Sequence, residues 1–431
     1  MNEMKTCVVG LGYIGLPIAS LLASQGYQVH GVDIDEEVVR TIRNGDTHII
    51  ERDLDCIVKE AVQNGTLTVS TKPIQADVFI ISVPTPITKY YEPDVSYVKN
   101  AVDSIIPVLK EGDLVIIEST CPVGTTEMVA DVIEQKRLDI TVQGSNKGNE
   151  KSRIYVAYCP ERVLPGHILQ ELKMNDRVVG GMNEDSTRKA KDFYKGFVKG
   201  NLLETNARTA EMVKLTENSF RDVNIAFANE LSIICDQLQI DVWELISLAN
   251  HHPRVNILQP GPGVGGHCIA VDPWFIVNSA PEQSKLIYTA RIVNDNKMYH
   301  VVQKIREQAV KFSTPTIACF GLSFKANIDD LRESPAMKIV EQLIEFEDKE
   351  ELLVVEPYIS TLPSNLQTGG IRLTSIDEAL EKAEIIVFLV DHDKFKSINQ
   401  KLLINKTVID TRGMIKYSAR KQHLTQMEYN S

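Results

Sequence analysis

The amino-acid sequence predicts an α/β protein in which two parallel-sheet domains are joined by a central helical region with one long helix. The sheets are predicted because short apolar runs alternate with helical segments over the first 200 residues, and this alternation returns after residue 305. Wholly apolar runs are typical of parallel strands that helices cover on both faces. The long helix is predicted because residues 207–239 contain neither proline nor glycine.

The expected domains span residues 1–200, 201–305 and 306–431. In the first domain, strands are expected at residues 5–9, 28–32, 78–82 and 114–118, and helices at residues 14–24 and 95–109. Further α/β segments are expected at residues 153–161 and 177–181, and an exposed polar loop at residues 143–152. In the third domain, strands are expected within residues 314–321, 352–357, 384–391 and 406–413, and helices at residues 335–347 and 376–383.

The long central helix is expected to carry an apolar stripe. Its apolar residues recur at spacings of three to five, at Met212, Leu215, Phe220, Val223, Phe227, Leu231, Ile234 and Leu238. Such a helix either links two domains and offers a dimer surface or is a plain core helix, and the sequence leaves both open. A second helix is expected after Asp241, whose carboxylate can cap its first turn.

Composition narrows the class of partner. The 46 Lys and Arg residues against 58 Asp and Glu residues give a net charge of −12, which argues against a nucleic-acid partner. The seven cysteines form no CxxC pair, which argues against a disulfide framework or a metal site and favours a reducing cytoplasm. The apolar residues 7–23 are too few for a membrane span and lack a cleavage region.

A glycine-rich turn between the first expected strand and helix predicts a Rossmann-like, dinucleotide-binding domain. Gly10 allows the tight turn, Gly12 lets the backbone approach a pyrophosphate, and Gly15 permits close packing of helix on strand. Asp33 ends the next strand, where it can accept hydrogen bonds from ribose hydroxyls and would repel a 2′-phosphate, so NAD is favoured over NADP. The candidate cofactor contacts here are Gly10, Gly12, Tyr13, Ile14, Gly15 and Asp33.

Two further loops follow expected strands of the same domain. They carry Thr85 and Thr120 at the carboxyl ends of strands, where ligands of open α/β sheets bind. Both threonines are therefore candidate cofactor contacts, and ordinary turn chemistry is the alternative for each.

The segment at residues 260–273 places Cys268 at the end of a loop dense in glycine. A cysteine that serves only as a small buried hydrophobe is the alternative interpretation. A dehydrogenase that stops at an aldehyde needs no thiol. Oxidation onward to an acid does, because a thiolate that adds to the aldehyde gives a thiohemiacetal, from which a second hydride can leave to form a thioester. Cys268 therefore indicates a four-electron oxidation.

Two pairs of polar residues are weaker candidates. Lys214 and Asn218 are four residues apart on one helical face, where they can hold a water or a developing alkoxide, although most such faces are merely solvated. Lys325 and Arg332 flank two aspartates after the first strand of the third domain. They can bind nucleotide phosphates, and an exposed charged loop is the alternative.

Seven segments together resemble the UDP-glucose/GDP-mannose dehydrogenase family over nearly the whole chain. They are GLGYIGLP, SVPTP, ESTCPVGTTE, YCPERVLPG, AEMVKLTENSFRDVNIAFANE, GPGVGGHCIAVDP and GLSFKANIDDLRESPA. The resemblance implies an NAD-binding domain, a central dimerisation region and a C-terminal UDP-sugar-binding domain. HPRVNILQPGPGVGGHCIAVDPWF and NSFRDVNIAFANELS are most similar to members that oxidise UDP-N-acetyl-D-mannosamine to its uronate for bacterial surface polysaccharides, with two NAD+ per sugar.

The resemblance also implies roles for single residues. Cys268 matches the catalytic cysteine, Lys214 and Asn218 the pair that steadies the oxyanion and the sugar, and Asp272 a carboxylate that orients a water. Thr120 and Glu161 match residues that assist the water steps, Arg254 an arginine that reaches the neighbouring site of a homodimer, Lys325 a lysine of the substrate domain and Arg332 a cofactor contact. The candidate substrate contacts are Arg162, Val163, Leu164, Lys214, Asn218, Arg254, Gly265 and Lys325.

One position departs from the UDP-glucose branch of the family. That branch has a lysine immediately before the aspartate of the cysteine loop, where this chain has Val271. The difference favours a UDP-N-acetylhexosamine substrate, and UDP-N-acetyl-D-glucosamine remains the alternative to the mannosamine. Two further hypotheses stay open at this point: a hydroxyacid dehydrogenase that reduces one NAD+ per substrate, and an NAD-binding scaffold or sensor without turnover.

Overall fold

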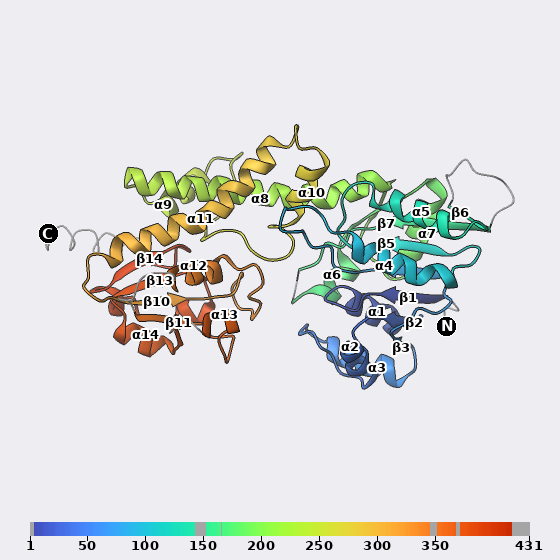
Figure 1. Cartoon of the computed structure of the whole chain (residues 1–431), viewed down its shortest axis with the longest axis horizontal. Helices are drawn as coiled ribbons and strands as arrows, with labels where there is room; N and C mark the ends of the chain where they lie inside the picture. The colour runs from blue at the N-terminus through green and yellow to red at the C-terminus, as the bar shows by residue number, and fades with distance from the viewer. Residues whose placement is uncertain (1–3, 143–151, 165, 345–350, 368–370, 416–431) are drawn as a thin grey trace. The chain divides into compact units, whose positions relative to one another are not determined.

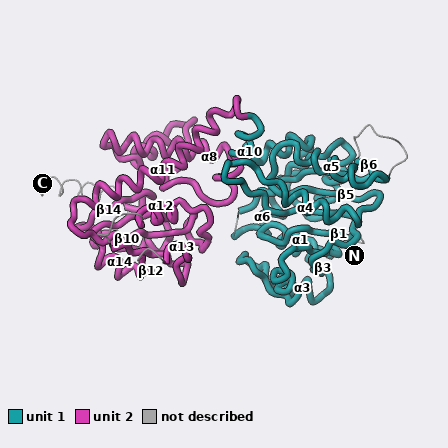
Figure 2. The backbone as a smooth tube through the Cα atoms, in the orientation of Figure 1, with its two compact units in different colours: residues 1–217, 274–280 teal, residues 218–273, 281–431 magenta. Residues whose placement is uncertain are grey.

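The computed structural model describes residues 4–142, 152–164, 166–344, 351–367 and 371–415. The expected loop at residues 143–152 lies almost wholly outside the described residues. The chain forms two compact units, each built from two separate stretches of sequence (Figure 2). The first unit contains residues 1–217 and 274–280, and the second contains residues 218–273 and 281–431.

The first unit is built on one large sheet with helices on both faces. Its strands run in the order β3-β2-β1-β4-β5-β7-β8-β9, and β6 pairs with β7. They are β1 (Lys5–Val9), β2 (Gln28–Val32), β3 (Leu67–Ser70), β4 (Val78–Ile81), β5 (Leu114–Ile117), β6 (Ile140–Val142), β7 (Ser152–Tyr158), β8 (Arg177–Gly181) and β9 (Leu202–Asn206). The helices are α1 (Gly15–Ser24), α2 (Glu36–Arg43), α3 (Leu54–Gln63), α4 (Ser96–Ile105), α5 (Thr125–Lys136), α6 (Ile168–Met174) and α7 (Glu184–Tyr194), with a 3₁₀ turn at Ile106–Val108.

The expected strands and helices of this unit are confirmed, but a wholly parallel sheet is not. Strand β8 runs antiparallel to β7, and only its last two residues, Gly180 and Gly181, pair with the end of β7. The chain turns back after β7 through α6, so that β8 begins beyond the carboxyl end of β7 and returns toward it. A parallel partner would have needed a full crossover connection.

Alternate residues of each central strand fill two different cores. In β1, Val8 packs into the core on one face, while Cys7 and Val9 pack into the core on the other. A short segment after the cysteine loop also belongs to this unit, because the ring of Trp274 stacks on Tyr91 with centroids 4.2 Å apart. Asn278 of the same segment donates a hydrogen bond to the carbonyl of Tyr91 at 2.9 Å.

The second unit contains a helical region in which two long helices run side by side (Figure 1). The helices of this region are α8 (Ala207–Leu238), which enters from the first unit, α9 (Val242–Ala249), α10 (Asp272–Ser279), most of which lies in the first unit, and α11 (Lys285–Ala309). Two of the expected features are confirmed: α8 matches the predicted long helix, and Asp241 caps α9 by accepting from the N–H groups of Trp243 and Glu244. Arg291 on α11 forms a buried ion pair with Asp222 on α8.

The second unit also holds a smaller sheet, which is parallel throughout. Its order is β12-β11-β10-β13-β14. The strands are β10 (Thr316–Phe320), β11 (Glu351–Val355), β12 (Arg372–Leu373), β13 (Ile385–Phe388) and β14 (Thr407–Asp410), and the helices are α12 (Pro335–Ile344), α13 (Ser364–Gln367), α14 (Ile376–Lys382) and α15 (Asp393–Lys396), with a 3₁₀ turn at Gln400–Leu403. Cys319 packs on the face that α11 and α12 cover, and Ala318 and Phe320 pack on the face that α14 covers.

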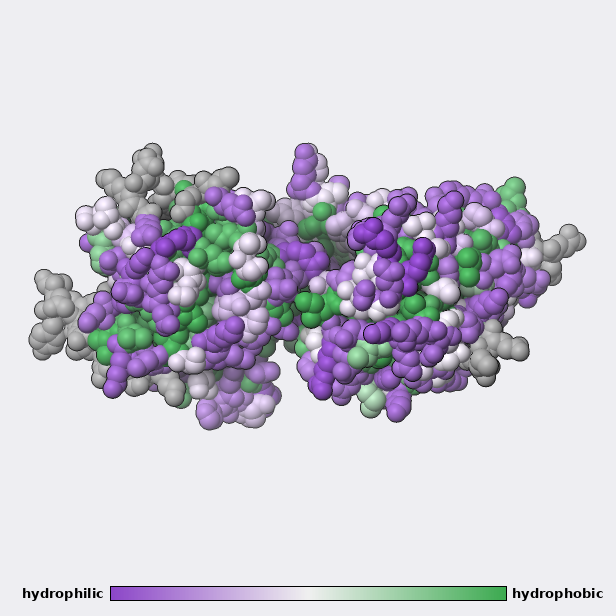
Figure 3. Space-filling view, turned by 90° about the horizontal axis from the view of Figure 1, so that it is seen from below, coloured by the Kyte–Doolittle hydropathy of each residue, from purple (hydrophilic) through white to green (hydrophobic). Residues whose placement is uncertain are grey.

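Hydrophilic residues cover most of the face shown in Figure 3, and hydrophobic residues form separate patches on it. Among the residues that the structure describes, no helix combines the length and the apolar composition that crossing a bilayer requires.

Candidate active site

The glycine turn of the first unit connects β1 to α1. Gly10 has φ +91°, a left-handed conformation that favours glycine. A Cβ at Gly15 would lie 1.7 Å from the carbonyl oxygen of Gly10, so only glycine allows the helix to start this close to the turn. A Cβ at Gly12 would meet no atom within 4 Å, and the backbone there faces open space. The turn therefore fits a pyrophosphate that approaches the start of α1.

Asp33 lies directly after β2 and is tied to this turn. Its Oδ2 accepts from the backbone N–H of Leu11 at 2.9 Å, and its Oδ1 accepts from Asp35 N–H at 3.0 Å. The carboxylate is thus fixed beside the glycine turn, and each oxygen has further lone pairs for a ribose hydroxyl. Directly before α1, Tyr13 is exposed and Ile14 is half-buried.

The two threonine loops meet at the carboxyl ends of β4 and β5. The hydroxyl of Thr85 donates to the carbonyl oxygen of Thr120. Directly before that loop, the carboxylate of Glu118 is buried against Arg177 at 3.4 Å and accepts from Tyr194 Oη at 2.6 Å. Burial raises the pKa of Glu118, although the guanidinium of Arg177 opposes that effect. These buried contacts therefore fix the residue at which the loop that carries Thr120 begins.

Lys214 and the segment after β7 also come together in the first unit. The Lys214 ammonium donates to the backbone carbonyl of Glu161 at 2.7 Å. Glu161 is buried and its Oε2 accepts from Val163 N–H at 2.7 Å. Arg162 pairs with Glu217 on α8 at 2.8 Å. The candidate substrate residues at 162–164 are therefore attached to the helix that carries Lys214.

In the second unit, the cysteine loop is attached to α8 through Asn218. Asn218 Nδ2 donates to Asp272 Oδ2 at 2.5 Å, and both residues are buried. The N–H groups of Val271 and Asp272 donate to the carbonyl of Cys268 at 3.1 and 2.8 Å, which closes a turn before α10. Cys268 itself is exposed. The exposure of its thiol contradicts the interpretation of Cys268 as a core residue.

The glycines of this loop pack closely on a second loop, between β10 and α12. A Cβ at Gly265 would lie 2.5 Å from the carbonyl oxygen of Glu333, and one at Gly266, where φ is +82°, would lie 2.9 Å from the ring of Phe324. Glycine is therefore required for contact between the two loops. The contact brings the segment that carries Lys325 and Arg332 against the cysteine loop.

The cations predicted in the second unit differ in their surroundings. Arg332 pairs with Asp330 through two hydrogen bonds of 2.9 and 2.7 Å, whereas Lys325 is exposed. Arg254 is exposed in the turn after α9, where its N–H donates to His252 Nδ1 at 3.3 Å. Within the described part of this single chain, no hydrogen bond or ion pair joins Arg254 to another candidate site residue.

Sequence reasoning missed several buried polar residues that hold these loops. Asn229, at 0% exposure on α8, accepts from the N–H of Gly261 at 2.8 Å at the start of the cysteine loop. Glu118 and His392 were missed as well. A signal existed for one of them, since Glu118 directly follows an apolar strand.

Comparison with known proteins decides the family. Models of the UDP-glucose/GDP-mannose dehydrogenase family match residues 4–198 as the NAD binding domain, 208–296 as the central domain and 318–417 as the UDP binding domain. The chain belongs to the UDP-glucose/GDP-mannose dehydrogenase family. It is an oxidoreductase whose cofactor is NAD, and the predicted family resemblance is confirmed.

The relatives are named for two different sugars. The chain is 56% identical, over 94% of its length and 95% of the relative, to an NDP-N-acetyl-D-galactosaminuronic acid dehydrogenase of Ralstonia nicotianae. It is 54% identical, over 96% and 100%, to the UDP-N-acetyl-D-mannosamine dehydrogenase of Escherichia coli K12. Among solved structures, a UDP-D-ManNAc dehydrogenase of Pyrococcus horikoshii matches with a TM-score of 0.85 and 41% identity over 96% of both chains.

Proposed function

We propose that the protein oxidises C6 of UDP-N-acetyl-D-mannosamine to the carboxylate, giving UDP-N-acetyl-D-mannosaminuronate for a surface polysaccharide. The observation that carries this proposal is the exposed thiol of Cys268. The backbone carbonyl of Cys268 accepts from the N–H of Asp272, and the carboxylate of Asp272 accepts from Asn218 on α8. An alcohol dehydrogenase that stopped at the aldehyde would have no use for that thiol. The relatives named for UDP-N-acetylmannosamine support the choice of sugar.

The first oxidation needs a proton acceptor and a stabilised oxyanion. We assign Lys214 and Asn218 to the oxygen at C6, where an ammonium and an amide stabilise developing negative charge. Asp272 orients the water that takes the hydroxyl proton. In the structure the Lys214 ammonium donates a hydrogen bond to the backbone carbonyl of Glu161. We propose that, when substrate binds, the ammonium donates to the sugar oxygen instead.

The second oxidation passes through Cys268. Its thiolate forms a C–S bond to the aldehyde carbon, a hydride leaves that carbon, and water cleaves the resulting thioester to release the thiol and the acid. Thr120 and Glu161 assist these water steps. One alcohol and one water become one carboxylate, with two hydrides and three protons released.

We propose that bound NAD+, the acceptor of each hydride, is held by the glycine turn and Asp33. The open space above Gly12 and the fixed carboxylate of Asp33 support this assignment. The proposed cofactor contacts are Gly10, Gly12, Tyr13, Ile14, Gly15, Asp33, Thr85, Thr120 and Arg332. The proposed substrate contacts are Arg162, Val163, Leu164, Lys214, Asn218, Arg254, Gly265 and Lys325.

A second sugar is favoured by a specific observation, the relatives named for N-acetyl-D-galactosaminuronic acid. The deciding experiment is a panel of UDP-N-acetyl-mannosamine, -galactosamine and -glucosamine and UDP-glucose, with NADH measured by absorbance and the acid by mass. We expect two NADH per sugar and the highest kcat/KM for the mannosamine. A higher kcat/KM for another sugar would reassign the substrate, and one NADH per sugar would reject the four-electron reaction.

We also propose that the protein is a cytoplasmic homodimer in which Arg254 reaches the neighbouring site. On α8, Phe220, Phe227 and Ile234 are spaced seven residues apart and are 68%, 50% and 44% exposed, which supports a helix-packing surface. Phe227→Glu should give a monomer in analytical ultracentrifugation, and a dimer that survives this change would place the interface elsewhere.

We also propose a three-part division at residues 1–200, 201–305 and 306–431, which the ranges of the three family models support.

The proposed cytoplasmic location is consistent with the chemistry, because a reducing compartment keeps a catalytic thiol reduced.

A further inference from the structure

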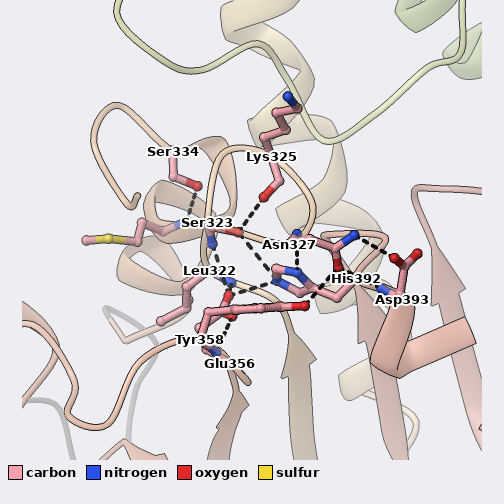
Figure 4. Close-up of polar contacts among 10 residues, drawn as sticks. Leu322, Ser323, Lys325, Asn327, Ser334, Glu356, Tyr358, His392 and Asp393 are labelled. Atoms are coloured by element: carbon pink, nitrogen blue, oxygen red, sulfur yellow. Dashed lines mark hydrogen bonds and ion pairs between the residues drawn. The ribbon is translucent and has the colours of Figure 1, made fainter. Parts of the chain in front are cut away.

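Three strands of the smaller sheet end at the point where its order reverses. Strand β11 lies on one side of β10 and β13 on the other, and open α/β sheets bind ligands at such a point. Here the place is filled by one buried polar residue from the end of each strand: Ser323 after β10, Glu356 after β11 and His392 after β13 (Figure 4).

Hydrogen bonds fix the state of the His392 ring. The backbone N–H of Asn327 donates to His392 Nδ1 at 2.9 Å, so Nδ1 is an unprotonated acceptor. The proton is therefore on Nε2, which lies 3.1 Å from Glu356 Oε2 and donates to it. Glu356 Oε2 also accepts from the N–H groups of Leu322 at 2.7 Å and Ser323 at 3.2 Å. Burial alone would raise the pKa of Glu356, but these donors hold it below its usual value.

The cluster is not a hydrolytic triad. In a triad, the serine and the carboxylate bind opposite nitrogens of the ring. Here Ser323 Oγ and Glu356 Oε2 both approach Nε2, and Ser323 Oγ donates instead to the carbonyl of Lys325 at 2.7 Å. The three side chains are at most 3% exposed, so no substrate reaches them in this arrangement.

What the cluster holds is the loop at residues 322–333. Asn327 has φ +64°, a conformation that needs support in a residue with a side chain. Its amide supplies part of that support, since Oδ1 accepts from Tyr358 Oη and Asp393 N–H, and Nδ2 donates to Asp393 Oδ2 at 2.8 Å. Lys325 lies two residues earlier, and its side chain points away from the cluster (Figure 4).

We propose that His392 is a positioning residue for substrate binding: by accepting the Asn327 N–H, it holds the loop in the conformation that presents Lys325 to the diphosphate of the UDP-sugar. The inference rests on the proposed role of Lys325 as a substrate contact. Without the acceptor, the Asn327 N–H is left unpaired within the loop, and the left-handed turn that directs Lys325 outward loses its support.

Two substitutions test the two ring nitrogens of His392 separately. His392→Asn places an amide oxygen near the position of Nδ1 and keeps the acceptor for Asn327. In His392→Gln, the side-chain amide reaches the position of Nε2 and keeps a donor for Glu356. The acceptor for the Asn327 N–H is lost. We expect His392→Gln to weaken UDP binding at least tenfold in calorimetry and to raise the KM for the UDP-sugar, with kcat changed less than threefold. His392→Asn should bind UDP within threefold of the parent protein.

The far-ultraviolet circular dichroism of both variants should match that of the parent protein and reports that they are folded. The reverse order, with His392→Asn the weaker binder of UDP, would show that the contact with Glu356 matters and would overturn the proposal. Equal UDP affinity in His392→Gln and the parent protein would overturn it too.

Lys325→Ala tests the premise separately. If Lys325→Ala binds UDP as the parent protein does, the Lys325 contact and the positioning role are both wrong. Acid formation in the substrate panel would still report the oxidation on its own. If Lys325→Ala weakens UDP binding, adding His392→Gln to it should cause little further loss, because the histidine acts through that lysine. A full additional tenfold loss would show an independent role and contradict the proposal.

Discussion

Asn218 Nδ2 donates to Asp272 Oδ2 at 2.5 Å, and this bond joins the long helix to the residue that follows the cysteine turn. Asp272 in turn donates its N–H to the carbonyl of Cys268 at 2.8 Å. A side chain on α8 and the backbone of the candidate nucleophile are therefore connected through one buried carboxylate. Substitution of Asn218 should therefore affect both stability and the oxidation.

Asn218→Ala should lower the free energy of unfolding by about 1–3 kcal/mol, because it removes a hydrogen bond to a buried carboxylate. It should also reduce kcat for the UDP-sugar. Urea unfolding and NADH production measure the two effects. Ser219→Ala is a matched control, since the adjacent buried hydroxyl has no hydrogen-bond partner among the described residues. Equal stability of the two variants would contradict the assignment.

Cys268→Ala should abolish formation of the acid while leaving NADH affinity unchanged, because the thiol acts only on the sugar. Mass analysis of the product and a fluorescence titration with NADH check the two statements. Cys56→Ala serves as the control, as Cys56 is the other exposed cysteine among the described residues. Acid formation by Cys268→Ala at a rate near that of the Cys56 variant would exclude the covalent mechanism.

Asp33→Ala should raise the KM for NAD+ about tenfold, which corresponds to about 1.4 kcal/mol, and leave the KM for the UDP-sugar unchanged. The loss has two sources: the proposed ribose contact, and the Leu11 N–H that the carboxylate holds in the glycine turn. Discrimination against NADP should fall in the same variant, because the negative charge that repels a 2′-phosphate is gone. Initial rates with both cofactors measure these changes, and an unaltered KM for NAD+ would place the ribose elsewhere.

Lys297 should make the stability depend on pH in the alkaline range. Its ammonium is buried between α8 and α11 and donates to Ser232 Oγ at 2.6 Å. Burial lowers the pKa of Lys297 from 10.5 to about 8, although the carboxylate of Asp236 opposes this. Between these two pH values the unfolded chain binds more protons than the folded one, so stability should rise as pH rises.

Over that range the free energy of unfolding should increase by about 3 kcal/mol relative to Lys297→Met. Urea unfolding of both proteins at pH 8, 9 and 10 gives the difference directly. A difference that stays constant would mean that the lysine keeps its ordinary pKa in the folded protein, and one that shrinks with rising pH would mean that folding raises that pKa.

The features that sequence predicted best depend on local signals. The glycine turn and Asp33 were predictable because a strand, a turn and a helix follow one another within a few residues, and the cap at Asp241 for the same reason. The direction of β8 was not, because it depends on where the chain returns after β7 rather than on the composition of the strand.

Contacts between distant segments were equally beyond the sequence. The side chain of Asn229 accepts from the N–H of Gly261, 32 residues away, and that of His392 accepts from the N–H of Asn327, 65 residues away. Neither side chain lies near its partner in the sequence, so no local pattern identifies that partner. The roles of Lys214 and Asn218 came from resemblance, and the structure adds the backbone carbonyl and the carboxylate that they bind.

The stack of Trp274 on Tyr91 has a consequence for inheritance. Because residues 274–280 pack with the first unit although they lie far along the chain, that unit is not encoded by one uninterrupted stretch of gene. A recombination event that exchanged only the first 217 codons with a relative would bring in a new Tyr91 loop and leave in place the Trp274 segment that packs on the original one. The two rings should therefore be inherited as a pair, and viable chimaeras of this protein should carry both from the same parent.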